Sequence, residues 1–354
     1  MPHRPRLRFG IQLCDQHPAG ESMVQRLADN VEQVQLAREL GFDTIVAGQH
    51  YLASPLQMLQ SVPLLARLAP ETGDMTLATC ITLLALPNPV DIAEQIATLD
   101  VITNGRLRFG VGLGYRDVEF DAFGVARSER VHRLETHLGL VKDLLAGKSV
   151  SYESPYCRLD GVSLTLQTPQ RPHPRIWMGA DADGAVRRAA RTCDSWVINP
   201  HARIDTLQRQ VDEVYRPALA EAGKDFPDEL PMRREIYVAK DRATAIQEAS
   251  PWLFPKYQVY TSWGQDKALP PGDDFSGDFD QLLDNRFIVG SAEECIADLD
   301  RYRSTLGVTE FIVRVQWPGM PQAQALRNID AIGTSLIPHF RAEAEAAVRA
   351  GQNA

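Results

Sequence analysis

The chain has 354 residues, a length that suits one large α/β domain or two ordinary ones. Apolar residues make up 44% and charged residues 23% of it, which excludes a disordered or fibrous protein. The net charge of −9 argues against a nucleic-acid partner, because such proteins depend on clustered lysine and arginine. The five cysteines stand far apart, which excludes a disulfide framework and a thiolate zinc site, and no apolar run approaches a membrane span. These features predict a cytoplasmic protein.

Eight short apolar runs are spaced along the chain, and each predicts a β-strand. They comprise residues 7–13, 43–48, 75–84, 106–114, 175–180, 195–200, 233–240 and 309–315. Stretches of helical period follow most of them, at about 24–40, 88–103, 128–146, 184–192, 203–222 and 291–306. This alternation favours a (β/α)8 TIM barrel, with residues 1–354 forming a single domain. The pentapeptide RLRFG, which occurs at 6–10 and again at 106–110, opens strands one and four and supports a repeated architecture.

Capping residues mark the ends of several predicted helices. Asn88 and Pro89 suit an N-cap and a first-turn proline, and Ser291 with Glu294 forms a capping-box pattern. In the helix that Pro89 opens, the apolar positions expected to face inward are Ala93, Ile96, Leu99 and Ile102.

Two insertions fit the alternation badly. Residues 147–174, before strand five, predict an extended excursion, for which a hairpin is one form. Residues 250–286, before strand eight, are rich in Pro, Gly, Asp and aromatic residues and show no sustained helical or strand period. Long irregular segments of a compact domain are usually lids, binding loops or disordered, so the second insertion is either a lid or a flexible excursion.

Chemistry in such a barrel takes place at the C-terminal ends of the strands. Strand two ends in Gln49, His50 and Tyr51. The imidazole of His50 would face the mouth of the barrel, where it can exchange a proton near neutral pH. A histidine that only makes structural hydrogen bonds is equally compatible with this position.

Glycines occupy the ends of strands four and five. Strand four ends in a GVGLGY run at 110–115, where glycine permits close approach of a ligand, although tight curvature of the barrel is an alternative reason. Strand five runs through 178–184 into a helix whose backbone amides could hold a phosphate. Asp181 and Asp183 oppose that reading, since each would repel an anion unless it caps the helix.

Four segments combine these features in a specific order. They read GFDTIVAGQHY (41–51), LPNPVDIAEQIATLDVITNGRLRFGVGLGYRDVEFDAFG (86–124), PRIWMGADADGAVRRAARTCDSW (174–196) and FIVGSAEECIADLDRY (287–302). Over most of its length the chain thus resembles the bacterial-luciferase-like family of flavin-dependent oxidoreductases. The resemblance implies a (β/α)8 barrel that holds FMN or a deazaflavin at its C-terminal mouth.

The resemblance also implies roles for particular residues. His50 matches a histidine that serves in acid–base chemistry beside the flavin. The positions that match cofactor-binding sites are Cys80, Ile81, Gly112, Leu113, Tyr115, Arg127, Arg130, Gly179, Ala180 and Asp181. Of these, Cys80-Ile81 matches a site that often holds a non-prolyl cis peptide.

Two positions depart from the family pattern. Gln49 stands where luciferase-like members often carry an acid, so that position provides no carboxylate beside His50. Leu113 replaces an arginine with which luciferase itself meets the flavin phosphate. Arg127 and Arg130, at the start of the next helix, are therefore the candidates for pairing with the phosphate.

The function implied is a monooxygenase that oxidises a small organic substrate with dioxygen and reduced FMN from a separate flavin reductase. A deazaflavin-dependent dehydrogenase or reductase is one alternative, and a non-catalytic flavin-binding protein is another. Members of the family often dimerise, so a homodimer is an open expectation. Neither a metal, a nucleic acid nor a membrane is expected as a partner.

Overall fold

The computed structural model describes residues 6–352, and in it eight parallel strands form a closed (β/α)8 barrel. The strands are β1 (Arg8–Gln12), β3 (Thr44–Ala47), β5 (Thr76–Leu83), β6 (Leu107–Gly112), β9 (Arg175–Ala180), β10 (Ser195–Ile198), β11 (Pro231–Val238) and β13 (Glu310–Arg314). Around the barrel they are hydrogen-bonded in the order β10, β9, β6, β5, β3, β1, β13, β11. Pairing of Ile198 with Met232 joins β10 to β11 and closes the ring. All eight predicted strands are therefore confirmed.

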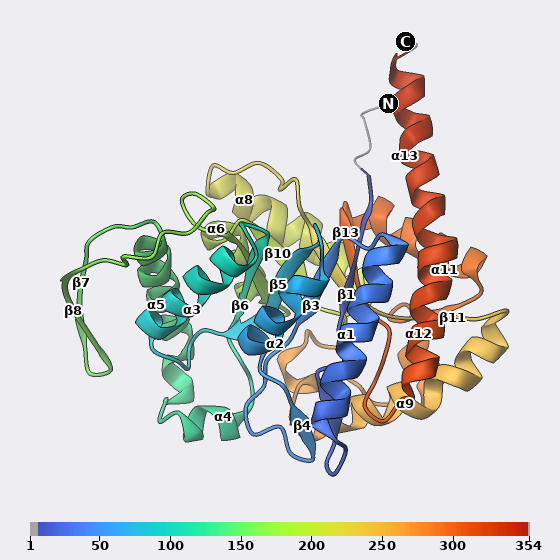
Figure 1. The fold of residues 1–354 in the computed structure, drawn as a ribbon, viewed down its shortest axis with the longest axis horizontal. Helices are drawn as coiled ribbons and strands as arrows, with labels where there is room; N and C mark the ends of the chain where they lie inside the picture. The colour runs from blue at the N-terminus through green and yellow to red at the C-terminus, as the bar shows by residue number, and fades with distance from the viewer. Residues whose placement is uncertain (1–5, 353–354) are drawn as a thin grey trace.

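Helices cover the outer face of the barrel (Figure 1). They are α1 (Met23–Leu40), α2 (Ser61–Leu68), α3 (Pro89–Ile102), α4 (Asp117–Ala122), α5 (Arg130–Leu145), α6 (Asp183–Thr192), α7 (Ile204–Arg209), α8 (Arg216–Glu221), α9 (Arg242–Ser262), α10 (Phe279–Leu283), α11 (Ala292–Leu306), α12 (Gln322–Ala331) and α13 (Ile337–Gln352). None of the helices between residues 6 and 352 is both long and apolar enough to cross a membrane.

The predicted caps are present. The Asn88 side chain accepts a hydrogen bond from the Val90 amide at 2.9 Å, and Ser291 with Glu294 forms a complete capping box. The inward face predicted for α3 is correct except at its end, since Ile102 is 46% exposed. Steps of three residues drift around a helix of 3.6 residues per turn, and the buried positions at this end are Asp100 and Thr103 instead.

The first insertion is an antiparallel hairpin of β7 (Val150–Ser154) and β8 (Cys157–Val162), which projects from the barrel in Figure 1. The second insertion is not irregular throughout, because α9 continues to Ser262. The prediction failed there because Pro251 and Pro255 stand inside the helix, and proline is unfavourable at such positions. Packing of the α9 aromatics into a core of their own outweighs that local preference.

Small elements complete the fold. Strands β2 (Gln16–Pro18) and β4 (Leu56–Met58) pair with each other, and β12 (Ile288–Gly290) extends the sheet beside β11. Inside the barrel, apolar side chains from alternate positions fill the centre, among them Val46, Ala78, Val197 and Ile312. The main apolar core lies between the strands and the surrounding helices.

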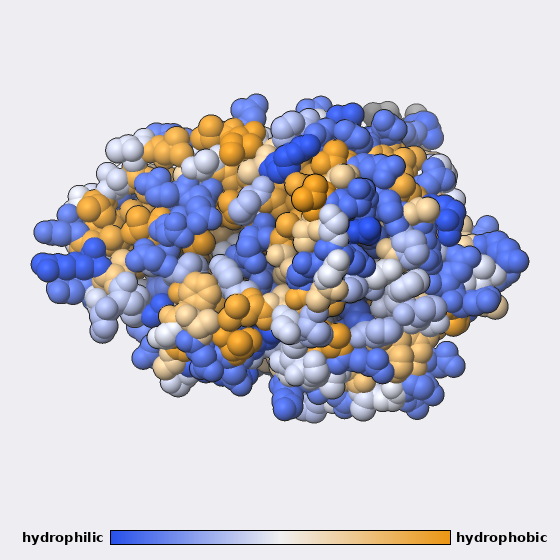
Figure 2. Space-filling view, turned by 60° about the horizontal axis from the view of Figure 1, so that its bottom comes forward, coloured by the Kyte–Doolittle hydropathy of each residue, from blue (hydrophilic) through white to orange (hydrophobic). Residues whose placement is uncertain are grey.

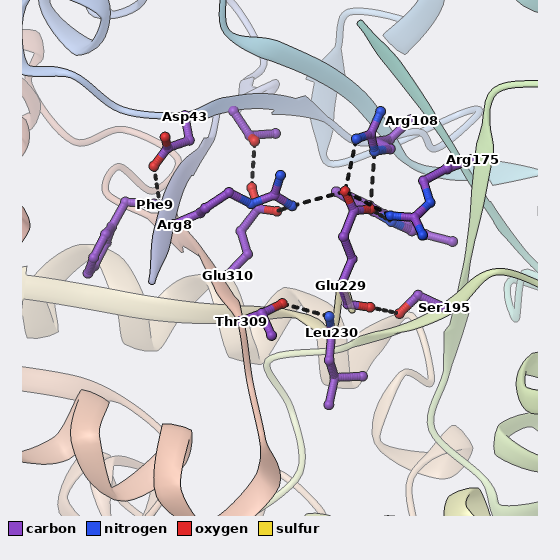
Figure 3. Close-up of polar contacts among 12 residues, drawn as sticks. Arg8, Phe9, Asp43, Arg108, Arg175, Ser195, Glu229, Leu230, Thr309 and Glu310 are labelled. Carbon is purple, nitrogen blue, oxygen red and sulfur yellow. Dashed lines mark hydrogen bonds and ion pairs between the residues drawn. The ribbon is translucent and has the colours of Figure 1, made fainter. Parts of the chain in front are cut away.

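Arginines from three strands converge on one carboxylate at the N-terminal end of the barrel (Figure 3). Arg108 donates to both oxygens of Glu229, at 3.2 and 2.9 Å. Arg8 and Arg175 each place a guanidinium nitrogen 3.3 Å from Glu229 Oε1. Arg8 also pairs with the buried Glu310 at 2.6 Å. Glu229 immediately precedes β11, so this network ties β1, β6 and β9 to the start of β11.

The network gives a physical role to the repeated pentapeptide. Arg8 and Arg108 occupy the same position in the two copies of RLRFG, and both bind Glu229. Burial alone would raise the pKa of Glu229, but the hydrogen bonds and charge of Arg108, with the charges of Arg8 and Arg175, lower it to about 2. The carboxylate is thus ionised at neutral pH and stabilises the closed barrel.

We expect Glu229→Gln to lower the free energy of unfolding by about 3 kcal/mol at pH 7, because three arginines lose their shared counter-charge. A carboxyl with a lowered pKa stabilises the fold above its unfolded-state pKa and loses that effect as the pH falls through the native value. The difference between wild type and variant should therefore shrink from pH 7 to pH 3 in urea unfolding curves. Glu221→Gln, which breaks the exposed pair with Arg191, is the control and should change stability by less than about 0.5 kcal/mol.

Candidate active site

A cavity of about 360 Å³ lies at the C-terminal ends of the barrel strands. Figure 1 shows β4, α4 and α9 gathered at this end, and Figure 2, which turns it toward the viewer, shows a mixed hydrophilic and hydrophobic surface. All eight barrel strands, or the residues directly after them, contribute to the walls. Tyr260, Gln265, Lys267 and Ala268, from the second insertion, complete the lining.

Most residues predicted from the sequence meet in this cavity. Those that line it are His50, Cys80, Ile81, Leu113, Tyr115, Arg127, Arg130, Gly179, Ala180 and Asp181. The exception is Gly112, which does not reach the cavity surface.

Gly112 instead provides the space for Ile81. A Cβ atom at Gly112 would lie 1.8 Å from Ile81 Cδ1, and one at Gly179 would lie 3.1 Å from Ile81 Cγ2. The peptide bond between Cys80 and Ile81 is cis, as the resemblance implies, and the pairing of β5 with β6 shifts register at this point. The glycines of two neighbouring strands thus let an apolar side chain of β5 form part of the cavity wall.

His50 is oriented by a carboxylate that sequence reasoning missed. Its Nδ1 lies 3.0 Å from Oε1 of Glu119, a fully buried residue of α4. The same oxygen accepts the Tyr51 backbone amide at 2.8 Å, and Arg116 lies 3.5 Å away. Position 49 provides no carboxylate, and Glu119 supplies one instead. Glu119 is 69 residues from His50 in the chain, so no local pattern could reveal the contact.

Aromatic rings surround His50. Tyr115 and Trp263 each meet it edge-on, with ring centroids 5.6 and 5.3 Å away. Burial raises the pKa of Tyr115 well above 10, so its hydroxyl stays a donor at neutral pH. That hydroxyl has no hydrogen-bond partner within residues 6–352. A polar group without a partner at a cavity wall is available to a bound molecule.

A second part of the cavity wall combines a helix N-terminus with two arginines. The α6 helix begins at Asp183, and Ala182 and Ala185 of its first turn line the cavity beside Arg127 and Arg130. The N-cap is Ala182, so neither aspartate caps this helix. Asp183 turns away and is neutralised by Arg209, which donates to both of its oxygens at 3.0 and 2.8 Å. One of the two objections to an anion at this wall is thereby removed.

Asp181 behaves differently from Asp183. Its carboxylate lines the cavity and accepts one hydrogen bond, from Asn199 at 3.0 Å. Burial raises its pKa to about 6, although Asn199 and the charge of Arg233 act in the other direction. The objection that remains, the charge of Asp181, is therefore weak below about pH 6 and strong at alkaline pH.

Sequence reasoning also missed three basic residues of the cavity wall. Arg233 lies on β11, Arg314 on β13 and Lys256 on α9. A usable signal existed for the first two, because a basic residue inside an otherwise apolar barrel strand is unusual. No such signal marked Lys256, whose helix the periodicity did not reveal.

Comparison with known proteins identifies the family of this chain. The family model described as "Luciferase-like monooxygenase" matches residues 7–310. The chain belongs to this family. Its resemblance to luciferase-like flavin-dependent oxidoreductases is thus confirmed over most of its length.

Relatives within the luciferase-like family differ in activity. The monooxygenase RslO1 of Streptomyces bottropensis is 28% identical, with a TM-score of 0.81 over 94% of this chain and 100% of that one. The phthiodiolone/phenolphthiodiolone dimycocerosates ketoreductase of Mycobacterium bovis is 29% identical over 74% of this chain and 71% of its own length.

Other solved structures share the fold of this luciferase-like protein. The oxygenating constituent of 3,6-diketocamphane monooxygenase of Pseudomonas putida, solved with FMN, is 18% identical with a TM-score of 0.75, over 94% of this chain and 98% of that one. An F420-dependent secondary alcohol dehydrogenase is also 18% identical, with a TM-score of 0.76 over 93% and 98%. These two structures, one solved with FMN and the other with an F420–acetone adduct, share the fold of this chain.

The stability of this luciferase-like barrel should depend on pH through the carboxyl group of Asp181. A carboxyl whose pKa is raised on folding destabilises the fold as the pH rises from its unfolded value of 3.8 through about 6. Asp181→Asn should therefore gain up to about 3 kcal/mol of stability relative to wild type between pH 4 and pH 8. Urea unfolding at both pH values measures the change, and Asp160→Asn, on the exposed face of β8, should show no such gain. An equal stability difference at both pH values would contradict this assignment.

Proposed function

We propose that this protein is a monooxygenase that oxidises a small organic substrate with dioxygen and reduced FMN supplied by a flavin reductase. The observation that carries the proposal is the placement of three features on one cavity. These are an anion-binding wall at α6, the apolar Ile81 wall and the carboxylate-oriented His50. Similarity to the monooxygenase RslO1 over nearly the whole chain supports this reaction class.

The cavity fits FMN by the chemistry of its donors. Arg127 and Arg130, with the first turn of α6, would hold the phosphate, as arginine and helix N-termini commonly do. Arg127 is balanced in part by Asp117 at 2.5 Å, whereas Arg130 donates only to the Arg127 carbonyl, at 2.7 Å. Ile81 and Leu113 would meet the apolar ring system. Reduced FMN, when bound, supplies the electrons that activate dioxygen.

The role of His50 follows from the hydrogen bond to Glu119. A carboxylate at Nδ1 favours the tautomer that carries its proton there and leaves Nε2 to exchange a proton with a bound molecule. Nε2 makes no hydrogen bond to the part of the chain that the structure describes. We assign acid–base chemistry to this atom and an orienting role to Glu119.

The second insertion would exclude water from the cavity, as a lid. Trp263 packs edge-on to His50, donates from Nε1 to the Ser54 carbonyl at 3.0 Å and lies under Arg116 at 4.1 Å. These contacts fix the end of α9 over the mouth. Oxygen chemistry on a flavin requires such shielding, because water and free solvent promote unproductive side reactions.

The decisive experiment mixes the protein anaerobically with reduced FMN and then with air-saturated buffer, while oxidised-flavin absorbance is followed by stopped flow. We expect absorbance to reappear more slowly than with free FMN, because the cavity shields the bound flavin. Reoxidation at the rate of free flavin, together with no binding of FMN, would reject the proposal.

A deazaflavin-dependent reductase is the second candidate, favoured by the ketoreductase relatives and by the basic lining of the cavity. Titration with reduced FMN and with reduced F420 in parallel separates the two. Tighter binding of F420, with no effect of air on the bound cofactor, would establish the reductase.

His50→Ala should retain reduced FMN with its affinity changed less than threefold, but lose about 10²–10⁴-fold in turnover, the usual contribution of an acid–base group. Turnover is measured as product formed from a substrate found by screening small organic molecules. Glu119→Gln, which keeps a neutral acceptor, should lose less than His50→Ala. Unchanged turnover in His50→Ala would remove this residue from the catalytic assignment.

The paired substitution Arg127→Gln and Arg130→Gln should weaken reduced FMN binding at least tenfold and leave riboflavin binding unchanged, because riboflavin lacks the phosphate. Anaerobic fluorescence titration measures both ligands. Arg158→Gln, on the exposed face of β8, serves as the control. Equal weakening of both ligands would show that the two arginines do not meet the phosphate.

The homodimer and the cytoplasmic location stay predictions of the sequence. So does the identity of the reductase.

A further inference from the structure

Two arginines on one side of the cavity have nitrogens without a hydrogen-bond partner in residues 6–352. Arg314, on β13, is only 5% exposed, and its Nη1 makes no hydrogen bond. Arg233, on β11, has an unpartnered Nε and a long hydrogen bond from Nη1 to Asn199 Oδ1 at 3.4 Å. Carboxylates act on both arginines by charge, but no described hydrogen bond joins them. A buried N–H group without a hydrogen-bond partner is costly, so it indicates an acceptor that arrives from outside the chain.

The nearby carboxylates are already occupied. Glu235 is fully buried and bonds to Lys256, to Trp317 Nε1 at 2.6 Å and to the Tyr257 hydroxyl at 3.4 Å. Asp15 accepts the Gly48 amide at 2.6 Å. Hydrogen bonds to other groups thus take up Glu235 and one oxygen of Asp15, whereas Asp15 Oδ1 has no hydrogen-bond partner in residues 6–352. Both carboxylates act on Arg314 by charge, but its Nη1 donates to neither of them and can donate to an anion in the cavity.

This pair lies far around the barrel from the proposed phosphate wall. In the closed strand order, β13 is four strands from β6 in either direction, which places it diametrically opposite. Arg127 and Arg130 follow β6, whereas Arg314 and Arg233 lie on β13 and β11. One phosphate cannot serve both groups of arginines.

We propose that Arg314 and Arg233 bind a carboxylate group of the substrate, so that the enzyme acts on small organic acids with an apolar or aromatic body. This inference rests on the proposed function, because it names the substrate class of the same cavity. Arginine suits the role since its planar fork matches a carboxylate with two hydrogen bonds.

The remaining wall fits the body of such a molecule. Tyr260 lines the cavity and stacks on Trp263, with ring centroids 5.6 Å apart and planes inclined by 22°. Its hydroxyl is already engaged with Gln16 at 3.0 Å, so the ring offers mainly an apolar face. Trp263 in turn packs against His50. An acid held at Arg314 would thereby extend past Tyr260 toward the proposed catalytic imidazole.

The test measures binding of benzoate and of benzamide, its neutral counterpart of the same shape, to the flavin-free protein by calorimetry. We expect wild type to bind benzoate at least tenfold tighter than benzamide. Arg314→Met and Arg233→Met should each weaken binding of benzoate at least tenfold and leave binding of benzamide unchanged. Arg327→Met, which removes an exposed arginine of α12, is the matched control and should keep the wild-type preference.

Two outcomes would overturn the proposal. One is equal affinity of wild type for benzoate and benzamide. The other is loss of the preference in Arg130→Met but not in the two cavity variants, which would place benzoate at the phosphate wall. Because Arg314→Met removes a buried residue, circular dichroism checks its fold, and the half-buried Arg233→Met gives an independent reading.

Reduced FMN is titrated into the same variants without benzoate. If Arg314→Met weakens binding of reduced FMN but leaves binding of benzoate unchanged, the two arginines serve the flavin and the substrate site is rejected. Since benzoate binding is read without flavin, failure of the FMN proposal and failure of this one are distinguishable.

Discussion

Convergence of Arg8, Arg108 and Arg175 on Glu229 is the interaction on which the barrel depends most directly. A closed ring of parallel strands needs its strand starts held in register, and here one carboxylate connects them across the N-terminal end (Figure 3). Polar groups concentrated at that end serve stability. The opposite end, built from loops and α9, is thereby free to vary its side chains for chemistry.

The apolar wall of the cavity depends on two glycines, which have no side chain. Gly112 and Gly179 admit Ile81, and no other residue fits at Gly112 without moving it, since a Cβ there would lie 1.8 Å from Ile81 Cδ1. Gly112 therefore makes room for a neighbouring side chain, whereas Gly114 of the same run lines the cavity. At Gly112 the group that approaches closely is a protein side chain.

Charge is distributed unevenly around the cavity. Asp183 is neutralised by Arg209, and Glu235 by Lys256, so that aspartates and glutamates near the cavity are mostly engaged. Arg314 and Arg233 keep nitrogens without a hydrogen-bond partner in residues 6–352, although burial of Arg314 makes this unfavourable. A chain with a net charge of −9 thus presents arginine donors at the cavity wall. Binding of anionic groups offers the physical reason for keeping them.

The sequence by itself determined the barrel, its eight strands and the caps at Asn88 and Ser291, and the family resemblance named ten of the residues that line the cavity. The strands and caps depend on local period and on glycine, proline and capping positions, which are written in neighbouring residues. Only the tertiary structure decided that Glu119 orients His50, that α9 contains two prolines, and that Arg314 Nη1 has no hydrogen-bond partner in residues 6–352. Each of these depends on contacts between residues far apart in the chain, and such contacts leave no periodic trace in a single sequence.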